Sequence, residues 1–224
     1  MAYGPEQRIE LALPTPARFL TPGVVALLVL MIIGYALFSH FNDLAMWHLA
    51  LNPAAVLSGG VWQLLTYPFV SGACGLVWNS VIVLFLGSAI EREWRTRSFL
   101  ALWVVVGIVC GLLWIGVSFI VPLFTNALLP AGMTASGCAY GIVGAFGVLF
   151  YRRRFWFFFW TIEAQQFAWL VVAIGLVIGI AWPPMWVWVA GAGVAYLYLK
   201  LTWGARDIWA GRRAAQRSRF EGLG

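Results

Sequence analysis

The residues best suited to chemistry are few and lie far apart in the sequence. Ser136 begins the run Ser-Gly-Cys-Ala-Tyr-Gly, and its hydroxyl becomes a good nucleophile when a neighbouring base takes its proton. Asn79 lies within an uncharged stretch, where an amide side chain indicates an internal face and a specific hydrogen bond. The two histidines are His40 and His48, so a His40–Asp43 pair acting on Ser136 is the acid–base combination that the sequence offers. The sequence thus contains a candidate nucleophile without an evident base.

The three cysteines suggest packing rather than chemistry. Cys74, Cys110 and Cys138 lack the spacing of metal ligands and give no sign of disulfide pairing. Cys138 is two positions from Ser136 and therefore lies on a different helix face, which disfavours a thiol nucleophile. We expect no metal and no cofactor.

The composition indicates a membrane protein. Of the 224 residues, 62% are hydrophobic and 10% are charged, whereas soluble domains carry roughly 25% charged residues. Four runs contain no Asp, Glu, Lys or Arg: Phe19–Ser39, Leu44–Ile90, Ser98–Tyr151 and Ala164–Leu199. A helical crossing needs about 20 apolar residues, so each run is long enough to cross at least once.

The basic residues predict the topology, because Lys and Arg near the ends of spans remain on the cytoplasmic side. They fall into four groups, listed in chain order: Arg8 and Arg18; Arg92, Arg95 and Arg97; Arg152, Arg153 and Arg154; Lys200, Arg206, Arg212, Arg213, Arg217 and Arg219. If all four groups share one side, the chain crosses six times and both termini are cytoplasmic. This topology accounts for the net charge of +6, so we expect no nucleic-acid partner.

We therefore expect an all-α membrane protein with three regions. Residues 1–18 form a cytoplasmic tail, residues 19–201 a six-helix membrane domain and residues 202–224 a basic cytoplasmic tail. The spans are expected at about Phe19–Ser39, Leu76–Ile90, Phe99–Ile120, Ala135–Arg152, Phe167–Trp182 and Met185–Leu201. The predicted localisation is a multi-pass protein of the cell membrane, of the bacterial inner-membrane kind.

Two segments between the spans are expected at the membrane interface. The segment 40–75 is apolar but interrupted by Pro and Gly, so we expect an irregular external loop, because such a backbone cannot cross lipid unpaired. The aromatic run Phe155–Trp160 should anchor the cytoplasmic interface. A surface that contacts a lipid or a pigment is the alternative for this run.

Small residues spaced four apart predict a tight helix pair. They are Gly137, Gly141 and Gly144 in the fourth span, with Gly191 and Ala195 in the sixth. Small side chains let helix backbones approach closely in lipid. We expect these two helices to form the closest pair of the bundle.

Three stretches together resemble the rhomboid family, which contains intramembrane serine proteases and their inactive relatives. Trp62–Phe69 is similar to a Trp-Arg segment of the first external loop, although Gln63 replaces the Arg. Asn79 with Leu86–Glu91 looks like the second helix, and Thr134–Gly144 resembles the Gly-x-Ser-Gly nucleophile motif. The resemblance covers roughly residues 20 to 200. It implies a six-helix bundle.

The resemblance also implies roles for individual residues. In active rhomboids a serine at the start of the fourth helix pairs with a histidine on the sixth, in a water-filled cavity open to the outside. Ser136 matches that nucleophile, Asn79 the oxyanion-stabilising Asn, and Tyr140 a Tyr that packs against the histidine. For Asn79, a structural hydrogen bond to the external loop is an equal alternative.

Four departures from the family pattern concern the catalytic parts. Aligning Gly191 and Ala195 with the family's His-x-x-Gly-x-x-x-Gly places Trp188 at the catalytic His. Gly75, Thr134 and Arg95 replace, respectively, a second His, the first Gly of the nucleophile motif and a Gly after Trp94. We expect Trp188 to fill the cavity beside Ser136 and Tyr140.

The function expected from these departures is non-catalytic. The protein would bind transmembrane segments of partner proteins within the bilayer, or serve as a subunit of a larger membrane complex. The alternative is an intramembrane serine protease that uses Ser136 with an unconventional base.

Overall fold

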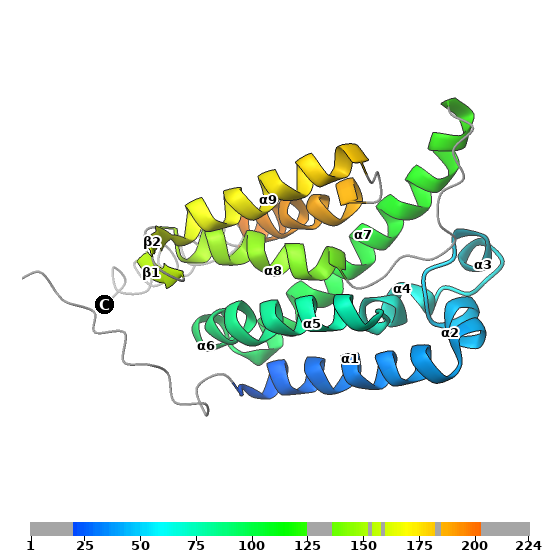
Figure 1. Cartoon of the computed structure of the whole chain (residues 1–224), viewed down its shortest axis with the longest axis horizontal. Coiled ribbons are helices and arrows are strands. Elements are labelled where there is room, and N and C mark those ends of the chain that lie inside the picture. The colour runs from blue at the N-terminus through cyan, green and yellow to red at the C-terminus, as the bar shows by residue number, and fades with distance from the viewer. Residues whose placement is uncertain (1–19, 125–135, 152–153, 158–159, 182–184, 203–224) are drawn as a thin grey trace, which may run out of the picture.

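The computed structural model describes residues 20–124, 136–151, 154–157, 160–181 and 185–202. Within these residues the chain is a helical bundle with one small β-hairpin (Figure 1). The long helices, in chain order, are α1 (Pro22–His40), a continuous second helix made of α5 (Ala73–Ile82), η3 (Val83–Gly87) and α6 (Ser88–Trp94), then α7 (Thr96–Phe124), α8 (Ser136–Leu149), α9 (Ala164–Ala181) and a helix over residues 185–202.

The lengths and composition of the helices are those of a membrane protein. Pro22–His40, Ala73–Trp94 and Thr96–Val121 are long and apolar enough to cross a bilayer, while Ser136–Leu149 and Ala164–Ile180 are shorter apolar helices. The predicted spans therefore coincide with helices, although each boundary shifts by a few residues. The predicted tails, residues 1–18 and 202–224, lie almost wholly outside the described residues.

The helix α8 lies at the centre of the bundle. Figure 1 shows α1, α5, α8 and α9 in succession across the molecule, with the helix 185–202 behind α9. Close packing of α1 on α5, of α5 on α8 and of α8 on α9 agrees with this order. Nearly every residue of α8 is buried, so its first residues lie in the interior of the molecule.

The expected irregular loop 40–75 is folded into short helices at one end of the bundle (Figure 1). They are α2 (Asn42–His48), α3 (Pro53–Leu57), α4 (Gln63–Thr66) and the 3₁₀ turn η2 (Tyr67–Phe69). Pro53 begins α3, where a missing N–H costs nothing, and the Asn52 side chain accepts the Ala54 N–H at 3.1 Å as an N-cap. The prediction of an irregular backbone was wrong, because local capping pairs the polar groups of this segment.

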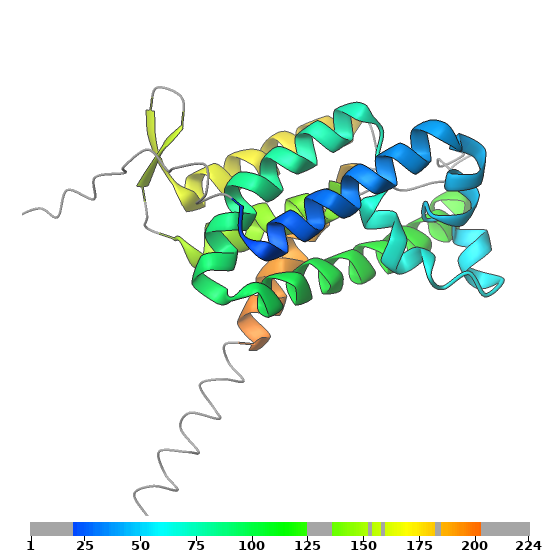
Figure 2. The same ribbon diagram turned by 90° about the horizontal axis from the view of Figure 1, so that it is seen from below.

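The β-hairpin is at the opposite end of the bundle (Figure 2). Strands β1 (Arg154–Phe157) and β2 (Trp160–Glu163) pair antiparallel, with Arg154 opposite Glu163 and Phe157 opposite Trp160. The aromatic run that we expected as an interface anchor is thus part of a hairpin. Alternation of aromatic and β-branched residues favours strands, a signal that our emphasis on hydropathy overlooked.

The second long helix contains a π-helical stretch, η3, which sets the direction of two buried polar residues. Asn79 and Glu91 are both buried although 12 residues separate them. On a regular α-helix that separation rotates the side chains about 120° apart. One residue inserted by a π-bulge reverses about 100° of this rotation. The π-helix therefore allows both side chains to face the core.

Glu91 satisfies the beginning of α1. Its carboxylate accepts the backbone N–H groups of Gly23 at 2.8 Å and Val24 at 2.9 Å, and the hydroxyls of Thr21 at 2.5 Å and Thr96 at 2.6 Å. A carboxylate at a helix N-terminus pairs with the first free N–H groups and with the positive end of the helix dipole. This buried charge therefore joins the start of α1 to α6 and α7.

Small residues do bring α8 against the helix 185–202, as predicted, but one of the expected contacts is different. A Cβ atom added to Gly191 would overlap the Gly137 carbonyl oxygen, and one added to Gly144 would lie 2.7 Å from the Ala192 Cα. Gly141 was placed wrongly, because a Cβ there would meet Val106 of α7 at 2.7 Å. Glycines at positions 137, 141 and 144 thus serve two neighbouring helices, since α8 is packed on several sides.

Candidate functional site

Ser136 is the first residue of α8 and is 7% exposed. Tyr140 follows one turn later and is also buried. A Cβ on Gly175 of α9 would be 2.9 Å from the Tyr140 hydroxyl and 2.5 Å from a Val189 methyl. Tyr140 therefore lies where α8, α9 and the helix 185–202 meet. The predicted nucleophile and its tyrosine are within the interior of the same helix junction.

Trp188 belongs to this end of the molecule. It lies three residues before Gly191, about 4.5 Å along the helix, and Gly191 touches the Gly137 backbone next to Ser136. The indole is half-buried and packs against the hydrophobic core. The register of the two helices thus agrees with the alignment that put Trp188 at the position of the family's histidine. Direct contact of the indole with Ser136 and Tyr140 stays a prediction.

Asn79 is fully buried on α5, and within the described part of the chain neither of its amide atoms has a hydrogen-bond partner. The hydroxyl of Ser71 is likewise buried and unpartnered among the described residues. Gly75 lies between them, and a Cβ there would be 3.3 Å from the Ser71 Cβ. Spacing of four places the three residues on one side of the start of α5. The amide of Asn79 is thus free to bond a group that enters this site.

This geometry decides between the two roles expected for Asn79. A structural hydrogen bond to the external loop would occupy its amide, and the described residues show none. Buried polar atoms without partners are rare and mark sites at which a further group binds. The side chain is therefore placed as a binding residue would be, although an oxyanion role stays a prediction.

The candidate bases lie on the surface rather than beside Ser136. His40 is exposed at the end of α1, with its Nδ1 3.1 Å from the Ser39 hydroxyl oxygen. His48 is exposed at the end of α2. The side chain of Asp43 lies outside the described residues. Glu91 is engaged at the start of α1 by its four hydrogen bonds. An exposed imidazole cannot act on a buried hydroxyl without rearrangement, because proton transfer needs hydrogen-bond distance.

Metal chemistry finds no support in the described residues, which contain no group of three or more His, Cys, Asp and Glu side chains that could hold an ion. The buried cysteines make packing contacts. The thiol of Cys138 lies 3.7 Å from the Trp103 carbonyl, and that of Cys110 would be 3.3 Å from a Cβ on Gly191. Cys74 is exposed.

Gln63, which stands at the family's Arg, is one of two functional supports that sequence reasoning missed. It is 1% exposed, its Oε1 accepts the Asn52 N–H at 2.9 Å, and its Nε2 donates to the Trp47 carbonyl at 2.7 Å. The Thr66 hydroxyl donates to the Leu49 carbonyl at 2.8 Å. These bonds fasten the loop to itself. The signal available was an amide in an otherwise apolar segment.

Tyr67 is the second support. Its hydroxyl donates to the Gly107 carbonyl of α7 at 2.5 Å, and burial raises the pKa of Tyr67 well above the usual value of a phenol. The hydroxyl therefore remains a donor at all physiological pH values. This bond ties the external loop to α7 and holds it over the bundle near the start of α5.

Comparison with known proteins gives one positive result. A search of curated proteins returns no match to this chain. A family model described as the rhomboid domain matches residues 58–204, a region that covers more than half of the chain and contains Asn79, Ser136 and Trp188. The chain therefore belongs to the rhomboid family.

Proposed function

We propose that this protein is a non-catalytic rhomboid-like membrane protein that binds transmembrane segments of partner proteins. In this proposal the chain crosses a bacterial cell membrane six times. Both termini and the turns around Arg95 and Arg153 are cytoplasmic, because all 14 basic residues then lie on one side.

The observation that carries the proposal is the pairing of Trp188 with Ser136. The register through Gly191 and Gly137 puts an indole at the level where a protease needs an imidazole. An indole N–H donates but offers no basic lone pair, so it cannot take the serine proton. The described histidines are exposed, at the ends of α1 and α2.

A groove for a partner helix is supported by the packing of α5 and α9. Both helices pack on α8, but they make at most marginal contact with each other. Each presents large apolar side chains outward, such as Val77 at 64% exposure on α5 and Val177 at 67% on α9. In family members the space between the second and fifth helices admits a substrate helix. Without hydrolysis, the same space would hold a partner helix.

Site-specific photo-crosslinking in native membranes tests this proposal. A photoreactive residue at Val77 or Val177 should capture one or a few defined membrane proteins. The control is Ile32 on α1, which is 57% exposed and apolar but far from the α5–α9 side. Equal capture from all three positions, or lipid alone from Val77 and Val177, would contradict partner binding.

The same material distinguishes a transient binder from a complex subunit. A stoichiometric partner that stays with the protein through purification would favour a subunit of a larger complex. Crosslinks to several partners, each lost on purification, would favour transient binding of transmembrane segments.

A further inference from the structure

We propose that a cavity between α9 and the helix 185–202 binds an anionic phospholipid, with an acyl chain in its apolar part and the phosphate at its polar end. This site is on the side of α9 that faces the helix 185–202, away from the α5–α9 side. The inference therefore goes beyond the proposed partner binding and does not depend on it.

The cavity exists because two helices approach α8 through small residues and then diverge from each other. On one side, a Cβ on Gly147 would lie 2.5 Å from the Ala168 Cβ. On the other, Gly144 meets Ala192. Between these contacts Gly193 is exposed, and a Cβ added there would meet nothing within 4 Å. The resulting cavity has a volume of about 750 Å³, within the range of about 300–1,000 Å³ of ligand sites.

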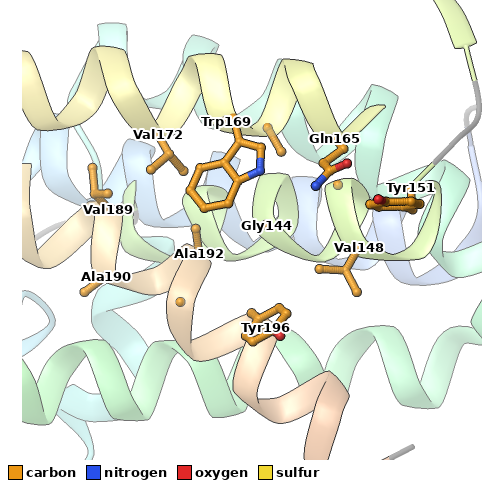
Figure 3. A pocket seen from close by; sticks show the side chains of 13 residues that line it. Gly144, Val148, Tyr151, Gln165, Trp169, Val172, Val189, Ala190, Ala192 and Tyr196 are labelled. Atoms are coloured by element: carbon orange, nitrogen blue, oxygen red, sulfur yellow. The ribbon is translucent and has the colours of Figure 1, made fainter. Parts of the chain in front are cut away.

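The walls of the cavity change in character along its length (Figure 3). Trp169, Val172 and Val189 form an apolar part, with the Trp169 indole lying across it. Tyr151 and Gln165 lie together at the other end. An apolar channel that ends in amide and phenol groups matches a lipid, whose acyl chain continues into a polar glycerol ester.

Positive charge gathers at this polar end. Tyr196 lines the cavity, and Lys200 follows it by four residues, one turn along the same face of the helix. Lys200 is exposed. The sequence also continues from Tyr151 directly into Arg152, Arg153 and Arg154. Basic groups beside an intermembrane pocket favour anionic head groups over zwitterionic ones.

The size of the cavity favours a lipid chain over a partner helix. A spanning helix about 30 Å long and 10 Å wide occupies roughly 2,000 Å³, several times the volume of the cavity. An acyl chain is thinner and flexible, so it can follow the divergence of the two helices. Trp169 is 65% exposed and would cover the chain from the bilayer side.

Native mass spectrometry of the full chain, titrated with phosphatidylglycerol or with phosphatidylcholine of the same acyl chains, tests the proposal. The wild-type protein should retain one phosphatidylglycerol molecule in preference to phosphatidylcholine. Gly193→Leu places a side chain in the open cavity and should lower retention of both lipids about tenfold. Gly116→Leu is the matched control, because Gly116 on α7 also has open space around its Cβ position.

The head-group part has its own variant. Lys200→Gln leaves the cavity unchanged and should reduce the preference for phosphatidylglycerol about fivefold. Arg97→Gln, which removes an exposed charge at the start of α7, should leave that preference unchanged. Because Lys200 is exposed, its replacement keeps the fold even if Gly193→Leu does not.

Three results would overturn the proposal. Equal retention of the two lipids by wild type would remove the anionic head group. Equal behaviour of Gly193→Leu and Gly116→Leu would exclude the cavity as the site. A photoreactive residue at position 193 that captures a membrane protein instead of phospholipid would assign the cavity to a partner helix.

Discussion

At the scale of single residues, the second long helix ends in two unusual positions that have opposite effects on stability. Glu91 is a buried carboxylate with four hydrogen bonds. Arg95, four residues later, has φ 71° and ψ 150°, a region of backbone conformation that is open to glycine and costly for other residues. One residue strengthens the junction of α1, α6 and α7, and the other strains it.

Glu91→Gln should destabilise the protein by about 1–3 kcal/mol, because an amide replaces one acceptor oxygen with a donor and leaves N–H groups of α1 unsatisfied. Thermal unfolding in detergent measures the loss. Glu93→Gln is the control, since Glu93 is exposed on the same helix and should change little. Similar midpoints for the two variants would show that the Glu91 carboxylate does not hold α1.

Arg95→Gly should raise the unfolding midpoint, by the equivalent of about 1 kcal/mol, because glycine adopts this backbone conformation without a Cβ clash. Arg97→Gly removes the same charge from a helical position in α7 and should lower the midpoint by a similar amount. A fall in stability for Arg95→Gly would mean that the arginine side chain contributes more than its backbone costs.

At the scale of the elements, α8 depends on glycine for its contacts with α7 and with the helix 185–202. Gly144→Leu should cost several kcal/mol, since its Cβ would already lie 2.7 Å from the Ala192 backbone and overpacking of this kind is not relieved by a rotamer change. Gly116→Leu, in open space, is the matched control. Wild-type stability of Gly144→Leu would place the helix contact elsewhere.

The elements also show what the sequence could and could not predict. Hydropathy and basic residues located all the long helices, because lipid imposes length and charge rules that act locally. The contact of Gly141 with Val106 was not predictable from spacing, since a stripe of small residues does not specify which neighbour it meets. The π-helix that turns Asn79 and Glu91 inward likewise leaves no mark in hydrophobic periodicity.

The candidate site followed the same division. Motif spacing predicted Ser136, Asn79 and Trp188, and the helix register agrees with the alignment around Gly191. The loop contacts of Gln63 and Tyr67 were missed, because they join side chains to backbone groups far away in the chain. The short helices of that loop depend on these contacts and on local capping rather than on periodicity.

At the scale of the whole molecule, the one-sided distribution of Lys and Arg predicts the topology. A cysteine introduced beside the amino terminus, or in the turn at Thr96, should be protected from a membrane-impermeant thiol reagent in intact cells. A cysteine at the exposed Ser58 in the external loop should react. Replacing the exposed Cys74 beforehand keeps the background low. Labelling of the amino terminus from outside would contradict six crossings with cytoplasmic ends.

The central claim is that the molecule keeps the rhomboid fold without the family's chemistry. An indole at the position of the base should leave the Ser136 hydroxyl protonated and its nucleophilicity low. Trp188→His alone should not restore activity, because Gly75 would still leave the oxyanion site incomplete, and that term is worth several kcal/mol.

The most direct test is reaction of the purified protein with a fluorophosphonate probe, together with cleavage of a transmembrane substrate that has a destabilised helix. An active rhomboid protease assayed in parallel provides the positive control, and Ser136→Ala provides the background. We predict labelling and cleavage at the level of Ser136→Ala. Labelling or cleavage by the wild-type protein that disappears in Ser136→Ala would contradict this account and establish an intramembrane serine protease with an unconventional base.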